Sequence, residues 1–169
     1  AEELALLDIL SGGRVKWGAG RGFDMREFAV FGVLPEESYA RFHEVVDIVL
    51  QAWTNDRLTY KGKFFSFENV EVLPKPLQQP HPPVWMAAGS PPALKWAASA
   101  GHSILMDPHS THAEIGQKLA FYRQQLIDHG LVHVRLLAGE RCPRHLLDLV
   151  GVGRDDGVDD LAAKPFHGL

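Results

Sequence analysis

The chain has 169 residues, of which 46% are hydrophobic and 22% are charged, and its 17 basic and 21 acidic side chains give a formal net charge of −4. This composition is typical of a soluble globular chain, and the length predicts one domain with a hydrophobic core. The acidic balance excludes non-specific binding to nucleic acid or to an acidic membrane, and no apolar run approaches the ~20 residues of a membrane span. A single cysteine, Cys142, excludes an internal disulfide framework and favours a cytoplasmic, reducing setting.

Residues 1–10 are predicted to form a helix, because their apolar side chains fall on one stripe. The Ser-Gly-Gly sequence at 11–13 ends this helix, since glycine tolerates the left-handed conformation found at helix C-termini. No N-cap residue precedes the helix, and the chain opens on Ala1 rather than on methionine. We therefore expect the chain to start inside a larger fold; trimming of a complete protein is the alternative.

A short strand is predicted at 14–19, where apolar and polar residues alternate with period two. Residues 20–22 end it, and the aromatic segment 23–34 is predicted to be further loop. Pro35 and the two glutamates after it start a helix, since proline fits the first turn and acids face the positive end of the helix dipole. A stripe of apolar side chains carries this helix as far as Trp53.

The segments Leu58–Tyr60 and Phe64–Phe67 flank a turn at 61–62, a pattern typical of a β-hairpin. Residues 74–92 hold seven of the eleven prolines, so the first part of this segment is predicted to be an extended connector. The run Val84–Ala88 is continuously apolar, which predicts a strand buried on both faces.

A helix is predicted from Ala93 to Ala100, and a short strand follows at Ser103–Met106. Thr111 and Glu114 have the spacing of a capping box, in which each side chain accepts the backbone N–H of the other residue. The helix that they start is predicted to reach His129. Helices and strands that alternate in this order form a parallel sheet with helical crossovers, so the predicted fold class is α/β.

The character of the sequence changes after the last predicted helix. We expect residues 1–130 to form the α/β domain and residues 131–169 to be a tail of uncertain structure, with a short helix at 144–150. The acidic stretch Asp155–Asp160 lacks the alternating acids of a calcium loop, so it is predicted to be a solvated turn.

The turn after the apolar strand is the first candidate binding site. In a parallel α/β fold, loops at the carboxyl ends of strands form the binding face, and a helix N-terminus there offers free amides to a phosphate. Gly89 permits close approach of a ligand to the backbone, and Ser90 adds a hydroxyl. The two prolines that follow lack an amide proton, which reduces the number of donors. The alternative is structural: Ser90 only caps the helix that the prolines start.

The loop Gly20-Arg21-Gly22 is the second candidate. It lacks the third glycine of a dinucleotide fingerprint and no helix follows directly, which excludes that interpretation. Arg21 is expected to point its guanidinium at the carboxyl-end face of the preceding strand, where a polar ring or a phosphate accepts its N–H groups. A local salt bridge of Arg21 with Asp24 or Glu27 is the alternative.

Three further patterns give no predicted site. Asp107, His109 and His112 lie close in sequence, but the two histidines do not share a helix face, so we expect no metal centre. Ser90 lacks the frame of a nucleophile elbow. Cys142 is flanked by arginines, and an incidental thiol is the preferred interpretation.

Two stretches of the sequence resemble one enzyme family. They are SGGRVKWGAGRGFDMREFAVFGVLPEESYARF, at 11–42, and KGKFFSFENVEVLPKPLQQPHPPVWMAAGSPPALKWAASAG, at 61–101. Both are similar to the corresponding stretches of bacterial luciferase-like flavin monooxygenases, and the order of the landmarks matches as well. The resemblance covers residues 1–130 and does not reach the tail.

The resemblance implies a (β/α)8 TIM barrel that binds reduced FMN, activates dioxygen and oxygenates a small organic substrate, with the flavin reduced by a separate flavin reductase. Some relatives use the deazaflavin F420 instead and transfer hydride. The resemblance places Arg21 near the flavin and Ser90 at its phosphate, and Glu27 matches an acidic position beside the site. The cofactor-binding residues that it implies are Gly20, Arg21, Gly22, Ala88, Gly89 and Ser90.

This chain departs from the family pattern in two ways. Luciferase proper has Glu-Ser where this chain has Gly89-Ser90, and a hydroxyl where Ala93 stands, so the resemblance implies a phosphate hold that is weaker or supplied differently. A complete TIM barrel takes roughly 250 residues, so we expect a partial barrel that lacks its N-terminal and C-terminal strands. The family's active-site histidine would lie before Ala1.

The leading hypothesis is a flavin-dependent monooxygenase, inactive as an isolated fragment, whose catalytic residues and substrate the sequence does not identify. A non-catalytic flavin-binding or degenerate subunit, in a homodimer or heterodimer, is one alternative. An F420-dependent oxidoreductase is the other. Product formed from substrate and reduced flavin would indicate the first hypothesis, flavin binding without turnover the second, and F420 binding with indifference to dioxygen the third.

Overall fold

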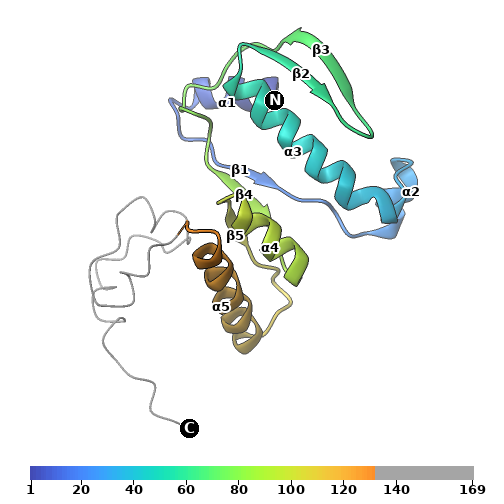
Figure 1. The fold of residues 1–169 in the computed structure, drawn as a ribbon, viewed down its shortest axis with the longest axis vertical. Helices are drawn as coiled ribbons and strands as arrows, with labels where there is room; N and C mark the ends of the chain where they lie inside the picture. Colours follow the sequence, from blue (N-terminus) through green and yellow to red (C-terminus); the bar gives the residue numbers. More distant parts are fainter. Residues whose placement is uncertain (132–169) are drawn as a thin grey trace. The chain divides into compact units, whose positions relative to one another are not determined.

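The computed structural model describes residues 1–131 of the chain, which divides into two compact units (Figure 1). The first unit is Ala1–Ala87, and the second begins at Ala88. The short helix expected at 144–150, the acidic stretch 155–160 and Cys142 lie outside the described residues. The division of the chain into a domain and a tail at residue 130 stays a prediction.

The opening helix is confirmed as α1 (Glu2–Leu10). It ends where Gly12 and Gly13 take φ values of +68° and +78°, a left-handed conformation that favours glycine. Ser11 is the C-cap, and its side chain donates a hydrogen bond to the carbonyl of Asp8 at 3.0 Å. The two glycines therefore release the chain from the helix as the sequence predicts.

The buried carboxylate of Asp8 ties α1 to the proline-rich connector. Its Oδ2 accepts the backbone N–H of Gln78 at 2.9 Å, and its Oδ1 accepts the side-chain amide of Gln78 at 2.7 Å. The same side-chain amide donates to the carbonyl of Val15 at 2.8 Å. Burial raises the pKa of Asp8, but the hydrogen bonds from Gln78 outweigh it, and the net pKa lies below its ordinary value. The ionised carboxylate thus joins segments 70 positions apart in sequence.

Two of the predicted strands pair in parallel in the first unit. They are β1 (Trp17–Ala19) and β4 (Val84–Ala87), with Trp17 opposite Val84 and Ala19 opposite Met86. The prediction that β4 is buried on both faces is wrong, because Val84 and Met86 are buried while Ala87 is exposed. Only alternate side chains of this apolar run are covered by other described residues.

The prediction of a loop throughout 23–34 is also wrong, because α2 (Met25–Val30) forms there. Asp24 is its N-cap: the carboxylate accepts the backbone N–H of Arg26 at 2.8 Å and the guanidinium of Arg26 at 2.9 Å. Phe28 is the buried residue of this helix. A capping aspartate starts this helix, which at six residues is too short for periodicity to detect.

The helix predicted to start at Pro35 is confirmed. A 3-10 turn, η1 (Pro35–Glu37), leads into α3 (Ser38–Thr54). Trp53 is buried near the end of α3, where its indole N–H donates to the carbonyl of Ala1 at 3.0 Å. Its ring meets that of Trp17 edge to face, with 5.1 Å between centroids. These contacts bring α1, β1 and α3 together in one core.

The hairpin is confirmed and is formed by β2 (Arg57–Lys61) and β3 (Ser66–Glu71), which pair antiparallel. The predicted turn at 61–62 is wrong, because Lys61 pairs with Ser66 and the turn lies at 62–65. Glu44 of α3 holds the turn between them, because its carboxylate accepts the backbone N–H groups of residues 63–65 at 2.7, 3.1 and 3.2 Å. Burial raises the pKa of Glu44, but these amides outweigh it and the net pKa lies below its ordinary value. The hairpin is therefore fixed to α3 at its tip.

The second unit contains the other three predicted elements: α4 (Pro91–Ser99), β5 (Ser103–Leu105) and α5 (His112–Asp128). The predicted capping box at the start of α5 is confirmed. Apolar faces of α4 and α5 pack against each other and exclude water. The buried side chains of this core are Leu94, Ala97, Ala98, Tyr122 and Leu126.

Tyr122 anchors α5 to the segment before β5. Its hydroxyl donates to the carbonyl of His102 at 2.6 Å, inside the core. Burial raises the pKa of this hydroxyl to about 12. The helices and short strands alternate through both units, in agreement with the predicted α/β class. Within the part of the chain that the structure describes, no helix has both the length and the apolar character needed to cross a membrane.

Candidate functional site

The first candidate segment follows β1 in the first unit. Gly22 has a φ of +82°, so a side chain at this position would strain the backbone. A Cβ on Gly20 would lie 3.5 Å from the Cβ of Ala87, which is ordinary van der Waals contact. The loop therefore depends on glycine at position 22 for its conformation and less on glycine at position 20.

Arg21, between these glycines, is held by neutral groups. Its Nη1 donates to the hydroxyl of Ser38 at 2.7 Å. Its guanidinium carbon lies 4.1 Å from the ring centroid of Tyr39 and 5.7 Å from that of Phe28, within range of a cation–π interaction. The side chain is half-buried and approaches α3 and α2 by these contacts.

The alternative of a local salt bridge for Arg21 is wrong for the described residues. Asp24 pairs with Arg26 instead, at 2.9 Å, and this pairing lowers the pKa of the Asp24 carboxyl. Glu27 is exposed and accepts no hydrogen bond from Arg21 among the described residues. Of the five guanidinium N–H donors, only one has a hydrogen-bond partner in this part of the chain, so four remain for a ligand.

The second candidate segment follows β4 and opens the second unit. The backbone N–H of Ala88, which is buried, donates to the carbonyl of Leu105 at 3.1 Å. Ser90 is the N-cap of α4, with extended backbone, and Pro91 takes the first helical position. The carbonyl of Ser90 accepts the N–H of Leu94 at 2.9 Å. Ser90 thus takes the N-cap position that the structural alternative expects, but its side chain makes no capping hydrogen bond.

A polar cluster lies next to Gly89. It consists of Asp107, Ser110 and Lys118, which come from the loop after β5 and from α5. A Cβ built on Gly89 would lie 3.1 Å from Oδ2 of Asp107 and 3.8 Å from Nζ of Lys118. Glycine at position 89 is therefore what lets this cluster approach the turn.

The cluster is an ion pair reinforced by hydrogen bonds. Nζ of Lys118 lies 2.9 Å from Oδ2 of Asp107 and donates to the hydroxyl of Ser110 at 2.6 Å. That hydroxyl in turn donates to Asp107 at 2.9 Å, and the backbone N–H of His109 donates to the same carboxylate at 3.1 Å. Hydrogen bonds from Lys118 and Ser110 lower the pKa of Asp107 to about 2. Asp107 is thus a carboxylate throughout the physiological range.

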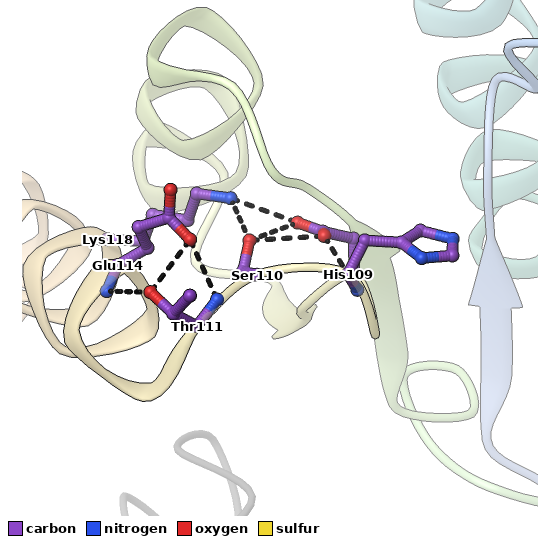
Figure 2. Close-up of polar contacts among 6 residues, drawn as sticks. His109, Ser110, Thr111, Glu114 and Lys118 are labelled. Atoms are coloured by element: carbon purple, nitrogen blue, oxygen red, sulfur yellow. Dashed lines mark hydrogen bonds and ion pairs between the residues drawn. The ribbon is translucent and has the colours of Figure 1, made fainter.

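The capping box at the start of α5 places Lys118. The Thr111 hydroxyl accepts the N–H of Glu114 at 3.3 Å, and the Glu114 carboxylate accepts the N–H of Thr111 at 2.7 Å (Figure 2). Lys118 follows Glu114 by four residues, one helical turn further along α5. Glu114 therefore caps the start of α5, and Asp107 forms the ion pair with Lys118.

The interpretation of Asp107, His109 and His112 is refined by this arrangement. In the described residues, Asp107 is engaged with Lys118 and Ser110, and no group of three potential metal ligands is brought together. Sequence analysis missed Lys118 and Ser110 altogether. The available signal was an acidic residue shortly after a strand, with a lysine in the second turn of the next helix.

The structure places the predicted site residues in two separate units. Within each unit, the glycine-rich turn lies beside one basic side chain: Arg21 in the first, Lys118 in the second. Each turn follows a strand of an α/β fold, where binding sites of such folds are found. This combination of parallel strands, helical crossovers and loops with basic side chains is that of the α/β class of folds, which includes the barrels.

The chain belongs to the luciferase-like monooxygenase family, whose family model matches residues 1–135. It is 32% identical over 121 residues to the oxygenase component of the flavin-dependent trigonelline monooxygenase of Acinetobacter baylyi, covering 70% of this chain and 33% of that protein. It is 35% identical over 108 residues to an F420-dependent glucose-6-phosphate dehydrogenase of Amycolatopsis mediterranei, covering 62% and 32% respectively.

A solved structure supports the same fold. The monooxygenase RslO1 of Streptomyces bottropensis matches with a TM-score of 0.70 and 35% identity, over 76% of this chain and 40% of that chain. The chain spans about a third of the length of the two curated relatives above. The prediction of a partial luciferase-like barrel is therefore confirmed, and so is the family.

Proposed function

We propose that the protein is the flavin-binding part of a flavin-dependent monooxygenase, which uses reduced FMN and dioxygen on a small organic substrate. The observation that carries this proposal is that the family match over residues 1–135 includes both candidate segments. The similarity to an oxygenase component named flavin-dependent supports the cofactor class. That name also supports a separate flavin reductase as the partner that supplies the reduced cofactor.

The residues present fit a phosphorylated flavin. Arg21 has four guanidinium N–H donors without partners among the described residues, and these suit the polar edge of a flavin or its phosphate. In the turn at 88–90, Gly89 lets a ligand come close to the backbone, and Ser90 carries a hydroxyl. We assign cofactor binding to Gly20, Arg21, Gly22, Ala88, Gly89 and Ser90.

When bound, reduced flavin supplies the electrons with which dioxygen is activated. The role of the residues in this chain is to bind and orient. Arg21 is oriented by Ser38 and Tyr39. Gly89 and Ser90 present backbone and hydroxyl groups at the start of α4.

Titration of the chain with FMN, followed by flavin fluorescence, tests this proposal. We expect saturable binding, weakened about 10- to 100-fold by Arg21→Ala, which is the effect of losing charged hydrogen bonds. Ser90→Ala should weaken binding by a smaller factor of roughly 5, the effect of one neutral hydrogen bond. The matched controls are Arg123→Ala and Ser99→Ala, exposed positions on α5 and α4. Absence of FMN binding, or equal effects of the controls, would contradict the proposal.

A second candidate function is F420-dependent hydride transfer, favoured by the similarity to an F420-dependent dehydrogenase. Competition of F420 against FMN in the same titration distinguishes the two cofactors. Oxygen consumption in the presence of reduced FMN and a reductase separates a monooxygenase from an F420 enzyme and from a non-catalytic flavin-binding subunit. We place the protein in the cytoplasm, on the single cysteine of the sequence, and leave a homodimer or heterodimer to sedimentation measurements.

A further inference from the structure

The turn that carries Ser90 is poor in hydrogen-bond donors. Pro91 and Pro92 have no N–H, and the N–H of Leu94 is already used by the carbonyl of Ser90. Ala93 contributes an amide but no side-chain hydroxyl. A dianionic phosphate at this turn would therefore meet few donors from the turn itself, and a further positive group is needed to hold it.

Lys118 is the cation next to this turn. Its Nζ lies 3.8 Å from the position that a Cβ on Gly89 would occupy, and its side chain is 26% exposed. An ammonium has three donors, and the described residues accept two of them, at Asp107 and Ser110. One N–H donor is thus left beside the backbone of Gly89, in a side chain whose position is fixed from two sides.

We propose that Lys118 is a ligand of the cofactor phosphate at the Ala88–Ser90 turn, and that Asp107 is the counter-ion that weakens its attraction for the phosphate. This inference rests on the proposed function, because it names a further residue of the same site. Ser110 bridges the two charges. The carboxylate of Asp107 also sets a limit: it repels the phosphate, so the pair accepts an anion only through the ammonium.

The ion pair of Lys118 with Asp107 is compatible with a bound phosphate. Glu114, the other carboxylate near Lys118, is engaged with the Thr111 cap, which leaves Asp107 as the counter-ion. A phosphate that reaches Lys118 takes the third N–H and leaves the ion pair in place. The lysine therefore senses the charge of the phosphate and is indifferent to the flavin ring.

A comparison of FMN with riboflavin, which lacks the phosphate, tests the inference on the full chain. We expect Lys118→Met to weaken FMN binding about tenfold, the value of one charge-assisted hydrogen bond, and to leave riboflavin binding unchanged. Inorganic phosphate should compete with FMN for the wild-type chain and compete less for this variant. Lys95→Met, an exposed lysine of α4, is the matched control and should change neither ligand.

Asp107→Asn distinguishes phosphate binding by Lys118 from a purely structural role of the ion pair. It breaks the same ion pair but keeps the ammonium, so FMN binding should be equal to or tighter than that of the wild type. Weaker FMN binding by Asp107→Asn, or equal loss of FMN and riboflavin by Lys118→Met, would mean that the pair only supports the turn and would overturn the inference. Unchanged FMN binding by Lys118→Met would overturn it as well.

Failure of the inference and failure of the proposed function give different results. If the wild-type chain binds FMN and Lys118→Met binds it equally, the inference fails and the proposed function stands. If the wild-type chain binds neither flavin, both fail. Lys118→Arg keeps the charge and should retain most FMN affinity, and circular dichroism of each variant verifies that the fold is intact.

Discussion

The two candidate segments hold their positive charges in opposite ways. In the first unit, Arg21 meets a hydroxyl and two aromatic rings, and the described residues offer it no carboxylate. In the second unit, Lys118 is paired with Asp107 at 2.9 Å and shares Ser110 with it. The first arrangement keeps the full charge for a ligand and depends on planar stacking, while the second keeps one donor and depends on a counter-ion. The two segments therefore offer cations with different numbers of donors left for a ligand.

The largest expected effect is on the free energy of unfolding, through Tyr122 of α5, the helix that carries Lys118. Tyr122 is buried, and its raised pKa means that its neutral form is favoured in the folded state. Its contribution to the free energy of unfolding is fully present below pH 10 and is lost as the pH rises through about 12, in total about 3 kcal/mol. Urea unfolding at a series of alkaline pH values, followed by circular dichroism, measures this loss. Tyr122→Phe should remove the dependence, and an unchanged slope in that variant would contradict the assignment.

Replacing arginine by lysine at position 21 and lysine by arginine at position 118 should weaken FMN binding to different extents. Arg21→Lys should weaken FMN binding roughly tenfold, because an ammonium cannot stack on Tyr39 while it donates to Ser38. Lys118→Arg should weaken it less than threefold, because Asp107 also accepts a guanidinium. Fluorescence titration with FMN measures both. Equal losses in the two variants would show that the contrast between the segments has no consequence for binding.

Two glycines of the second unit provide the smallest test. Gly89→Ala should lower the free energy of unfolding by roughly 1 kcal/mol, because the new methyl group would lie 3.1 Å from the Asp107 carboxylate. Gly116→Ala, in α5, meets no atom within 4 Å and should raise it by a similar amount through helix propensity. Chemical denaturation measures both variants. If both variants changed the free energy of unfolding in the same direction, Asp107 would not restrict the space at Gly89.

The sequence predicts elements well where their signals are local. The Thr111 and Glu114 capping box and the glycines after α1 were sufficient to find the ends of those helices. The helix α2 was missed because it has only six residues and a single buried side chain, Phe28, which leaves too short a stripe for periodicity to detect. The burial of β4 was overestimated, because an apolar run does not say which of its faces other residues will cover.

The candidate site could be predicted only in part, for a similar reason. Gly89 and Ser90 were found because a turn between a strand and a helix is a local pattern. Lys118 was not, because its distance from Asp107 is eleven residues and nothing in the spacing alone joins them. The hydrogen bond of Arg21 to Ser38, seventeen residues away, could not be foreseen either. Contacts of this kind depend on how elements pack, which periodicity does not report.

The link between Asp8 and Gln78 has a consequence for how this family can vary. It closes a loop of the chain that contains β1, α3 and the hairpin of β2 and β3, and β4, which pairs with β1, begins six residues after this closure. The register of β1 against β4 therefore does not depend on the hairpin, whose turn is held by Glu44 of α3. A hairpin of different length could be grafted at residues 62–65 with the parallel strands left in register. The segment is a replaceable module, and evolution or design could reshape it while the strand that leads to Arg21 stays in place.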